Sequence, residues 1–388
     1  MKRLIVCCDG TWNDEDSAAS FTNVVRMARA IRPQDDVSSG RSIPQIVYYH
    51  SGVGTGGDEV EKVLSGAIGL GLSRNVRDAY AFIVHNYAEG DELFLFGFSR
   101  GAYTARSVAG LIGWAGLIQK GDMDDFAMLW EGYRLRGQTP QPLTQYQFPD
   151  RRAPVRIKCI GVWDTVGALG IPGHLGDMFT KFYQFLDTSL GTHVENAFHA
   201  MAVDEHRDDF KPTLWQKQPG AEQVLQQVWF AGAHSNVGGG YQEHGLSDIT
   251  LAWMASRVIP MLSLDENYLT TRQDRRDGWA FGKIYDSATG FFGLRRQVDR
   301  QVLVAGGDAT CESIHASVEA RLAAGPGLPG GRYAPANLPD GAPAGSVKPL
   351  DPLEQRLRWT TPDPAQTGQS NRPPPTFVDR LLNSLGGG

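Results

Sequence analysis

Short apolar runs alternate along the chain with segments in which apolar residues recur every three or four positions. The runs are typical of buried strands in a parallel sheet, and they lie at 4–8, 46–49, 93–98, 155–163 and 224–230. Helical periodicity is found at 22–31, 74–87, 102–112 and 247–262. This alternation predicts an α/β fold in which an open, mostly parallel sheet carries helices on both faces.

Three further segments complete the predicted organisation. The stretch 171–223 is longer than an ordinary crossover connection, which indicates a helical insert over one edge of the expected site. Residues 302–305 are a candidate late strand. Twelve of the 22 prolines lie in the last 64 residues, so the end of the chain cannot build a core of its own. We expect one domain over 1–340 and an extended Pro/Gly-rich tail over 341–388.

The overall composition excludes several classes of protein. Glycine makes up 46 of 388 residues but follows no G-X-Y period, which excludes a collagen-like fibre. A net charge of −6 without a block of Lys and Arg argues against a nucleic-acid partner. The four cysteines lack the spacing of a zinc site or a disulfide framework, and Cys7 and Cys159 are expected to be buried thiols. We expect no metal and no other cofactor.

The first residues do not predict a secretory signal. The apolar run 4–8 is shorter than the roughly 7–15 residues of a signal-peptide core. No apolar run approaches the roughly 18 residues that would predict a membrane-spanning helix. We therefore expect a cytoplasmic protein, with export by a route that reads no N-terminal signal as the alternative.

The segment Gly97-Phe98-Ser99-Arg100-Gly101 carries the strongest local signal for chemistry. It has the pattern G-x-S-x-G, with an apolar strand before it and a helix after it. Because the backbone is crowded at such a strand-to-helix turn, the positions two before and two after the serine must be small. The turn exposes the serine Oγ to a base. We predict that Ser99 is the nucleophile of an α/β-hydrolase-like three-layer sandwich; the alternative is an ordinary serine in a glycine turn.

A nucleophilic serine requires a base, and the base requires an acid that orients it. In this fold the acid and then the base follow the serine along the chain, each after a strand. Asp164 follows the strand 155–163, and His234 follows the strand 224–230 and precedes three glycines. We predict that Asp164 is the acid and His234 the base. A turn carboxylate and a loop histidine are the alternatives.

Other histidines compete for the role of base. His315 lies in Ile314-His315-Ala316-Ser317, and His206 lies in a charged segment. Both are weaker candidates than His234, and His315 is retained as a substrate-binding or supporting residue. His85 lies within an amphipathic helix and is expected to be structural.

Two groups of backbone N–H donors could stabilise an oxyanion. One is the N–H of Arg100 at the start of the helix after Ser99. The other is the early loop that contains Gly10 and Thr11, with the glycine-rich turn at 52–54 as its alternative. Asp9 and Trp12 flank this early loop and are candidate substrate-binding or supporting residues. A cation at Asp9 is not favoured, because no metal-loop spacing surrounds it.

Several motifs occur together in a defined order. They are Cys8-Asp9-Gly10-Thr11-Trp12-Asn13, Thr22-Asn23-Val24, Gly52-Val53-Gly54-Thr55, Gly97-Phe98-Ser99-Arg100-Gly101-Ala102, Gly161-Val162-Trp163-Asp164-Thr165-Val166-Gly167, His234-Ser235-Asn236-Val237-Gly238-Gly239-Gly240-Tyr241 and Ile314-His315-Ala316-Ser317-Val318. From residue 2 to about residue 338, this pattern resembles an uncharacterised α/β-hydrolase-like family that includes phospholipase effectors of type VI secretion systems. The resemblance implies a lipid-ester hydrolase with Ser99 as nucleophile, Asp164 as acid and His234 as base.

Three functions follow from these features. The first is a serine esterase or lipase that cleaves lipid or phospholipid acyl esters and contacts a membrane surface. The second is a phosphatase, because Asp9-Gly10-Thr11 looks like part of a D-x-D-G-T loop, although Cys7 occupies the position of the nucleophilic Asp. The third is a non-catalytic binding or scaffold protein on a hydrolase fold. Aromatic residues that would line an acyl groove, or else lie in the core, are Phe179, Phe182, Tyr183, Phe185, Trp279, Phe281, Phe291 and Phe292.

Overall fold

The computed structural model describes residues 1–10, 21–36, 40, 42–52, 67–136, 155–166, 188–271, 279–288, 296–303, 309–328, 331–338, 346–348 and 350–356. These residues form a nine-stranded sheet in the order β2-β3-β1-β4-β5-β6-β7-β8-β9. The strands are β1 Arg3–Cys8, β2 Gln34–Asp35, β3 Ile43–His50, β4 Glu92–Phe98, β5 Ile157–Trp163, β6 Val194–Ala202, β7 Val224–Phe230, β8 Glu312–His315 and β9 Val347–Lys348. Neighbouring strands pair in parallel except for β2 with β3.

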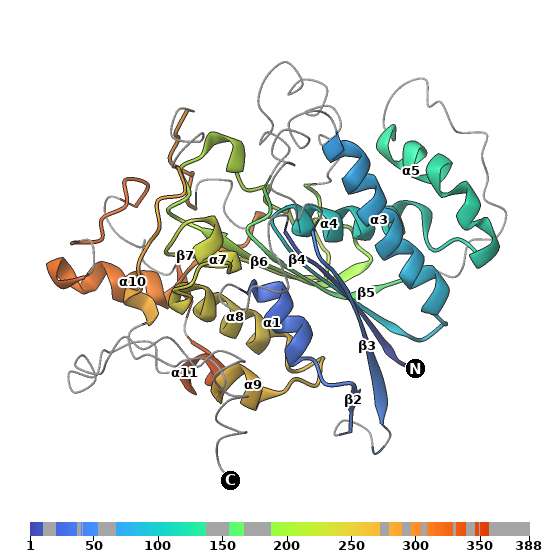
Figure 1. The fold of residues 1–388 in the computed structure, drawn as a ribbon, viewed down its shortest axis with the longest axis horizontal. Helices are drawn as coiled ribbons and strands as arrows, with labels where there is room; N and C mark the ends of the chain where they lie inside the picture. Colours follow the sequence, from blue (N-terminus) through green and yellow to red (C-terminus); the bar gives the residue numbers. More distant parts are fainter. Residues whose placement is uncertain are drawn as a thin grey trace, which may run out of the picture.

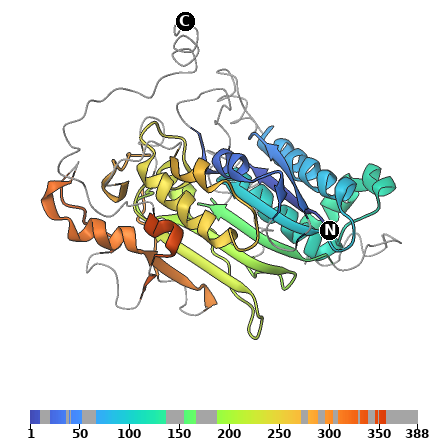
Figure 2. The same ribbon diagram turned by 90° about the horizontal axis from the view of Figure 1, so that it is seen from below.

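Helices cover both faces of this sheet (Figure 1). Those on one face are α3 Ala67–Asn86, α4 Arg100–Ala115 and α5 Phe126–Arg134. Those on the other face include α1 Asn23–Ala30, α8 Gly245–Val258 and α9 Glu266–Thr271. From β1 to β9 the strands lie side by side in the order β1, β4, β5, β6, β7, β8 and β9, which is also their order in the chain. In Figure 2 the colours across the sheet therefore pass from blue through green to orange. The result is an α/β three-layer sandwich with a mostly parallel sheet, as the sequence pattern predicts.

Alternation along the strands produces a hydrophobic core on each face of the sheet. In β1, Leu4 and Val6 face the helices α3 and α4, whereas Ile5 and Cys7 face α1 and α8. Every residue of β4 after its first is buried, as expected of a central parallel strand. Side chains on both faces of β1 and β4 are thus packed against helices. This packing holds the two strands in place and so determines the positions of their carboxyl ends.

The structure corrects three details of the expected organisation. Within the predicted helical insert, 194–202 is the strand β6, and no α-helix occurs in the described part 188–223. The late strand is β8 at Glu312–His315 rather than 302–305, of which 302–303 lie in irregular structure. The C-terminal tail is not extended throughout, because it supplies β9 and the short helix α11 Pro352–Arg356. The domain limits at 340 and 341 stay predictions.

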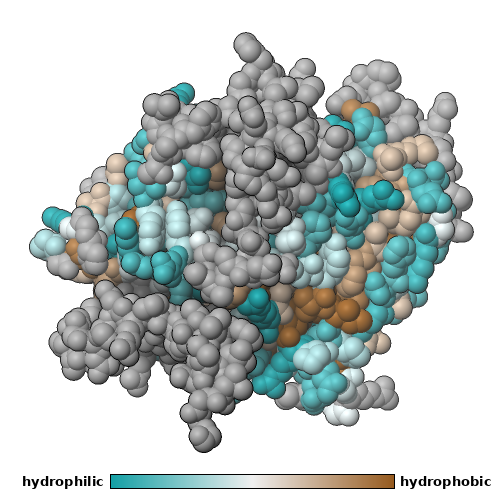
Figure 3. All heavy atoms as spheres, in the orientation of Figure 1, coloured by the Kyte–Doolittle hydropathy of each residue, from teal (hydrophilic) through white to brown (hydrophobic). Residues whose placement is uncertain are grey.

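No helix among the described residues is long and apolar enough to cross a membrane. The large hydrophobic side chains that are exposed in this part of the chain are far apart in sequence: Met1, Ile46, Trp114 and Val224. The face drawn in Figure 3 has its largest brown area below the centre, with smaller brown and light-brown areas elsewhere among teal and white atoms. Contact with a membrane surface stays a prediction.

Candidate active site

Ser99 lies between β4 and α4 in a strained backbone conformation. Its φ is 57° and its ψ is −120°, a region that residues with a side chain rarely adopt. Its N–H donates to Trp163 O on the neighbouring strand at 3.1 Å, and its carbonyl accepts from Tyr103 N–H at 3.2 Å. Ser99 is thus held at the tip of a sharp turn, partly exposed, with α4 beginning at the next residue.

Two glycines make this turn possible. A Cβ on Gly97 would lie 2.4 Å from the carbonyl oxygen of Gly101, and a Cβ on Gly101 would lie 2.0 Å from the carbonyl oxygen of Cys8. These neighbours are backbone atoms, which cannot move aside as the end of a flexible side chain can. The expectation that both positions must be small is therefore confirmed, and the start of α4 lies directly against the end of β1.

Asp164 and His234 form a buried hydrogen-bonded pair. Asp164 follows β5 with a φ of 39°, and His234 begins the short helix α7 His234–Gly238 after β7. His234 Nδ1 lies 2.6 Å from Asp164 Oδ2, and the two residues are 5% and 0% exposed. His234 was expected in a loop and lies in a short helix instead, but Ser99, Asp164 and His234 still follow the carboxyl ends of the strands β4, β5 and β7.

The imidazole of His234 lies beside the serine turn. Its ring centroid is 4.6 Å from that of Phe98, the residue before Ser99, and a Cβ on Gly238 would collide with the Phe98 ring. Among the hydrogen bonds between described residues, none joins Ser99 to His234. Such contacts are often long in the absence of substrate and shorten in the reacting complex. The structure therefore brings Ser99, Asp164 and His234 to one edge of the sheet, and of the two contacts expected among them it contains the hydrogen bond between Asp164 and His234.

Burial and charge set the protonation states of the pair. Burial lowers the pKa of His234, against the opposing effect of the hydrogen bond to Asp164, so its imidazole tends to be neutral. Although burial opposes it, the pKa of Asp164 lies well below its usual range, because Arg300 and His234 stabilise the carboxylate. Asp164 is thus charged and His234 is able to accept a proton.

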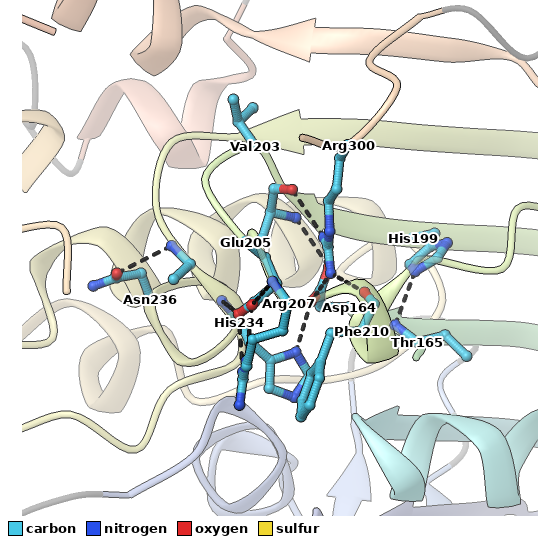
Figure 4. A network of polar contacts seen from close by, with 12 residues as sticks. Asp164, Thr165, His199, Val203, Glu205, Arg207, Phe210, His234, Asn236 and Arg300 are labelled. Atoms are coloured by element: carbon cyan, nitrogen blue, oxygen red, sulfur yellow. Dashed lines mark hydrogen bonds and ion pairs between the residues drawn. The ribbon is translucent and has the colours of Figure 1, made fainter. Parts of the chain in front are cut away.

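Three charged residues near this pair carry no signal in the sequence (Figure 4). Arg300 makes a two-pronged ion pair with Asp164. Glu205 accepts the backbone N–H of His234 at 3.2 Å and is ion-paired with Arg207 at 2.8 Å. Arg300 is a single arginine in an irregular segment, so no sequence pattern marks it as part of the site. Glu205 lies in a run of charged residues, which is also typical of a turn exposed to solvent.

The early loop is close to the serine turn but differs from the expected donor. Asp9 is buried and accepts hydrogen bonds from Thr22 Oγ1 and from Tyr49 Oη. The N–H of Gly10 donates to Asp9 Oδ1 at 2.7 Å, so a substrate oxygen would have to replace that contact. Thr11 and Trp12 lie outside the described residues. Arg100 is the first residue of α4, with its N–H at the helix N-terminus beside Ser99.

The other candidate histidines are engaged elsewhere. His315 is the N-cap of α10 Ala316–Ala323, with Nδ1 2.8 Å from Ser317 Oγ and Nε2 2.7 Å from Glu354. His206 is half-exposed and lies 2.9 Å from Asp299. His85 lies on α3 and is exposed. None of these three is paired with Asp164.

His199 on β6 is a buried neighbour of the site that the sequence did not indicate. Its Nε2 accepts the N–H of Thr165 at 3.1 Å, directly after Asp164. Burial lowers the pKa of His199 to about 3, so it is neutral across the physiological range. Its contact fixes the backbone that carries Asp164.

Two features bear on the alternative functions. Cys7, at the position of a phosphatase nucleophile, is fully buried, and burial raises its pKa well above its usual value. It cannot reach a substrate, so the phosphatase reading has no support here. Within the described ranges, no group of three or more His, Cys, Asp or Glu side chains is arranged to hold a metal ion. Of the aromatic residues considered for an acyl groove, Trp279 and Phe281 are described and the others lie outside the described residues.

Comparison with known proteins identifies the family. The family described as "T6SS, Phospholipase effector Tle1-like, catalytic domain" matches residues 2–257. The chain belongs to this family. The match covers the strands β1 to β7 and the elements that carry Ser99, Asp164 and His234, and it confirms the resemblance seen in the motifs.

The individual proteins to which this chain is similar share less than 30% sequence identity with it. An uncharacterized yeast protein, YEL023C of Saccharomyces cerevisiae, is 28% identical over 242 residues, which are 56% of this chain and 33% of that protein. A Tle1 effector solved bound to the VgrG spike of the type 6 secretion system is 19% identical, with a TM-score of 0.38, covering 62% of this chain and 51% of the other. An uncharacterized protein of known structure from Pseudomonas aeruginosa is 19% identical, with a TM-score of 0.37, and the match covers 66% of this chain and 45% of the other. The chain thus spans a third to a half of the length of these proteins.

Proposed function

We propose that this chain is a serine hydrolase that cleaves carboxylic esters, with lipid or phospholipid acyl esters as its substrates. The observation that carries the proposal is the buried hydrogen bond of 2.6 Å between Asp164 and His234 beside the strained turn of Ser99. Membership of a Tle1-like phospholipase family supports the lipid substrate. A non-catalytic scaffold would have no use for a strained serine next to an oriented, neutral imidazole.

In the proposed reaction, Ser99 Oγ attacks the acyl carbonyl carbon and its proton passes to Nε2 of His234. Asp164 accepts the Nδ1–H of His234 and stabilises the imidazolium that forms. The N–H of Arg100 stabilises the oxyanion, with Gly10 or Thr11 as the second donor. His234 then protonates the leaving alcohol oxygen, which leaves an acyl-enzyme. Water attacks this ester by the reverse proton transfers and releases the fatty acid.

Replacing Ser99 by Ala tests the proposal. Ser99→Ala removes the attacking oxygen and should lower ester hydrolysis by at least about 10³-fold. It should also abolish labelling by a fluorophosphonate, which reacts covalently with an activated serine. The measurement is a panel of p-nitrophenyl esters and defined phospholipids, assayed with wild type and variant side by side.

Ser256 offers a matched control for this substitution. It lies on α8, where its Oγ donates to Trp253 O at 2.6 Å, and Ser256→Ala should retain both hydrolysis and labelling. Folded wild-type protein that neither hydrolyses any ester of the panel nor reacts with the fluorophosphonate would overturn the proposal in favour of a scaffold.

Export stays part of the proposal. The Tle1 effector of known structure is bound to a VgrG spike, and by analogy this chain would leave the cell by a system that needs no N-terminal signal. Co-purification with a spike protein encoded nearby would support this, and retention in cells with an active secretion system would contradict it.

A further inference from the structure

We propose that Arg300 is a positioning residue of the active site, which clamps the Asp164 carboxylate in the orientation that accepts the Nδ1–H of His234. This inference rests on the proposed function, because the orientation matters only if His234 acts as a base. Arg300 would act through Asp164 and would not touch the substrate.

The clamp engages both oxygens of the carboxylate. Arg300 Nη1 donates to Asp164 Oδ1 at 2.6 Å, and Nη2 donates to Oδ2 at 3.0 Å. Oδ1 also accepts the N–H of Ala202 at 3.0 Å, and Oδ2 faces His234 Nδ1 at 2.6 Å. With both oxygens held, the carboxylate plane cannot turn away from the imidazole. A planar fork of two N–H groups suits this task better than the single ammonium of lysine.

Arg300 is itself rigidly held. Nη1 also donates to Ala202 O at 2.8 Å and Nη2 to Phe210 O at 2.5 Å, and the side chain is 2% exposed. Phe210 packs edge-on against the imidazole of His234, with ring centroids 5.0 Å apart. The guanidinium therefore fixes the acid and one flank of the base together, as Figure 4 shows.

Charge gives Arg300 a second effect on the base. Arg300 balances Asp164, and Arg207 balances Glu205, so the buried group is neutral while the imidazole of His234 is neutral. Protonation of His234 adds an uncompensated positive charge, which burial disfavours. Without Arg300, the unbalanced carboxylate would favour the imidazolium, and the base would be lost to protonation at a higher pH.

Among the described residues, the buried histidine on β6 is a further titratable neighbour of the site, and it does not change this balance. His199, on the adjacent strand β6, is fully buried, and burial lowers its pKa to about 3, so it is uncharged at physiological pH. The acidic limb of the pH profile of kcat/KM should therefore report the free enzyme's His234 under the influence of Asp164, Arg300, Glu205 and Arg207.

The test compares two substitutions of Arg300 in the full chain. Arg300→Ala should lower kcat by about 10²-fold with KM within about twofold of wild type, because a misplaced acid disorients the base. Its acidic limb should move up by about one pH unit, and added methylguanidinium should restore part of kcat. Arg300→Lys keeps the charge but not the fork, so its acidic limb should stay near that of wild type while kcat falls by about tenfold.

A second Arg–Asp–His group supplies the control. Arg26 is ion-paired with Asp248, which also lies 2.5 Å from Nδ1 of His244, and Arg26 is buried, as Arg300 is. Arg26→Ala should lose stability like Arg300→Ala, but it should keep the wild-type acidic limb and gain nothing from methylguanidinium.

The outcomes separate this inference from the proposed function. If the wild type is labelled and active, but Arg300→Ala keeps the wild-type acidic limb of the pH profile and is not rescued by methylguanidinium, then Arg300 has only a structural role. Full kcat in Arg300→Lys would likewise overturn the clamp, even if the alanine variant does not fold. A wild type without fluorophosphonate labelling would overturn both proposals together.

Discussion

At the scale of single residues, backbone strain marks the candidate site. Among the described residues, the non-glycine positions with positive φ are Ser99, Asp164, Leu303 and Cys311. Two of these four carry the proposed nucleophile and acid, and each is the first residue after a buried parallel strand. Such conformations cost about 1–3 kcal/mol each and persist only where the surrounding structure enforces them. Packing of β4 and β5 in the sheet provides that enforcement.

The glycine behind the nucleophile gives a prediction at this scale. Gly101→Ala places a methyl group 2.0 Å from the Cys8 carbonyl oxygen, so either β1 or the start of α4 must move. We expect a loss of about 3 kcal/mol in the free energy of unfolding, measured by urea denaturation. Ester hydrolysis should fall as well, because the N-terminus of α4 carries the oxyanion donor.

Gly121 is the matched control for this substitution. It lies in the 3-10 helix Lys120–Asp125, where an added Cβ would meet nothing within 4 Å. Gly121→Ala should change the free energy of unfolding by no more than about 0.5 kcal/mol. Equal effects of the two substitutions would contradict the close approach of α4 to β1.

At the scale of helices and strands, local patterns predict the elements before and around the nucleophile. The strands β1, β3, β4, β5 and β7 and the helices α1, α3, α4 and α8 all lie where apolar runs or helical spacing place them. Thr22 caps α1 as expected, accepting the N–H of Val25 at 3.3 Å. In these elements the local sequence and the tertiary packing favour the same structure.

The sequence fails where an element depends on partners far along the chain. β6 reads VENAFHAMA, a segment with polar residues and helix formers, and it becomes a strand because β5 and β7 pair with it on both sides. β9 has only two residues and exists by pairing with β8. Arg300 reaches Asp164 across 136 residues of sequence. Ser99, Asp164 and His234 could be predicted because each follows a recognisable strand, whereas the residues that orient them could not.

The short helix α11 gives a prediction at the scale of an element. Glu354 on α11 is buried, with Oε1 2.7 Å from His315 Nε2 and Oε2 accepting the N–H of Asp351 at 3.0 Å. Glu354→Gln removes the charge and should destabilise by about 2 kcal/mol. Backbone amides of β9 and α11 should lose protection in hydrogen exchange before those of β4 do.

Glu319 provides the control for that experiment. It lies exposed on α10, and Glu319→Gln should leave both the stability and the exchange pattern unchanged. Uniform loss of protection across the whole sheet in Glu354→Gln would mean that α11 unfolds only with the rest of the molecule.

At the scale of the whole molecule, the candidate site depends on the complete sheet. The nucleophile follows β4, the acid follows β5 and the base follows β7, while Arg300 comes from an irregular segment after α9. Since these parts are brought together only by global folding, conditions that unfold the sheet must abolish activity at the same time. The buried carboxylates at this edge of the sheet make both the stability of the fold and the activity depend on pH.

Acid should unfold the protein through Asp164 and Glu205. Burial opposes ionisation of Glu205, but its hydrogen bonds to Arg207 lower its pKa from 4.5 to about 2, and the pKa of Asp164 is lowered as well. A carboxylate with a depressed pKa in the folded state stabilises the protein fully above its unfolded pKa. That stabilisation disappears as the pH falls through the folded value. For Glu205 the window is about pH 4.5 to 2, and the contribution at stake is roughly 3 kcal/mol.

Glu205→Gln isolates this contribution. The free energy of unfolding, measured in urea at several values between pH 7 and pH 2.5, should be lower than that of wild type at pH 7. The gap should close as the pH falls, because the wild-type carboxylate becomes neutral like the amide. Glu222, which is exposed in the irregular segment just before β7, gives the control, since Glu222→Gln should show a gap near zero at every pH. A gap for Glu205→Gln that stays constant down to pH 2.5 would show that its effect comes from altered packing or hydrogen bonding and not from the buried charge.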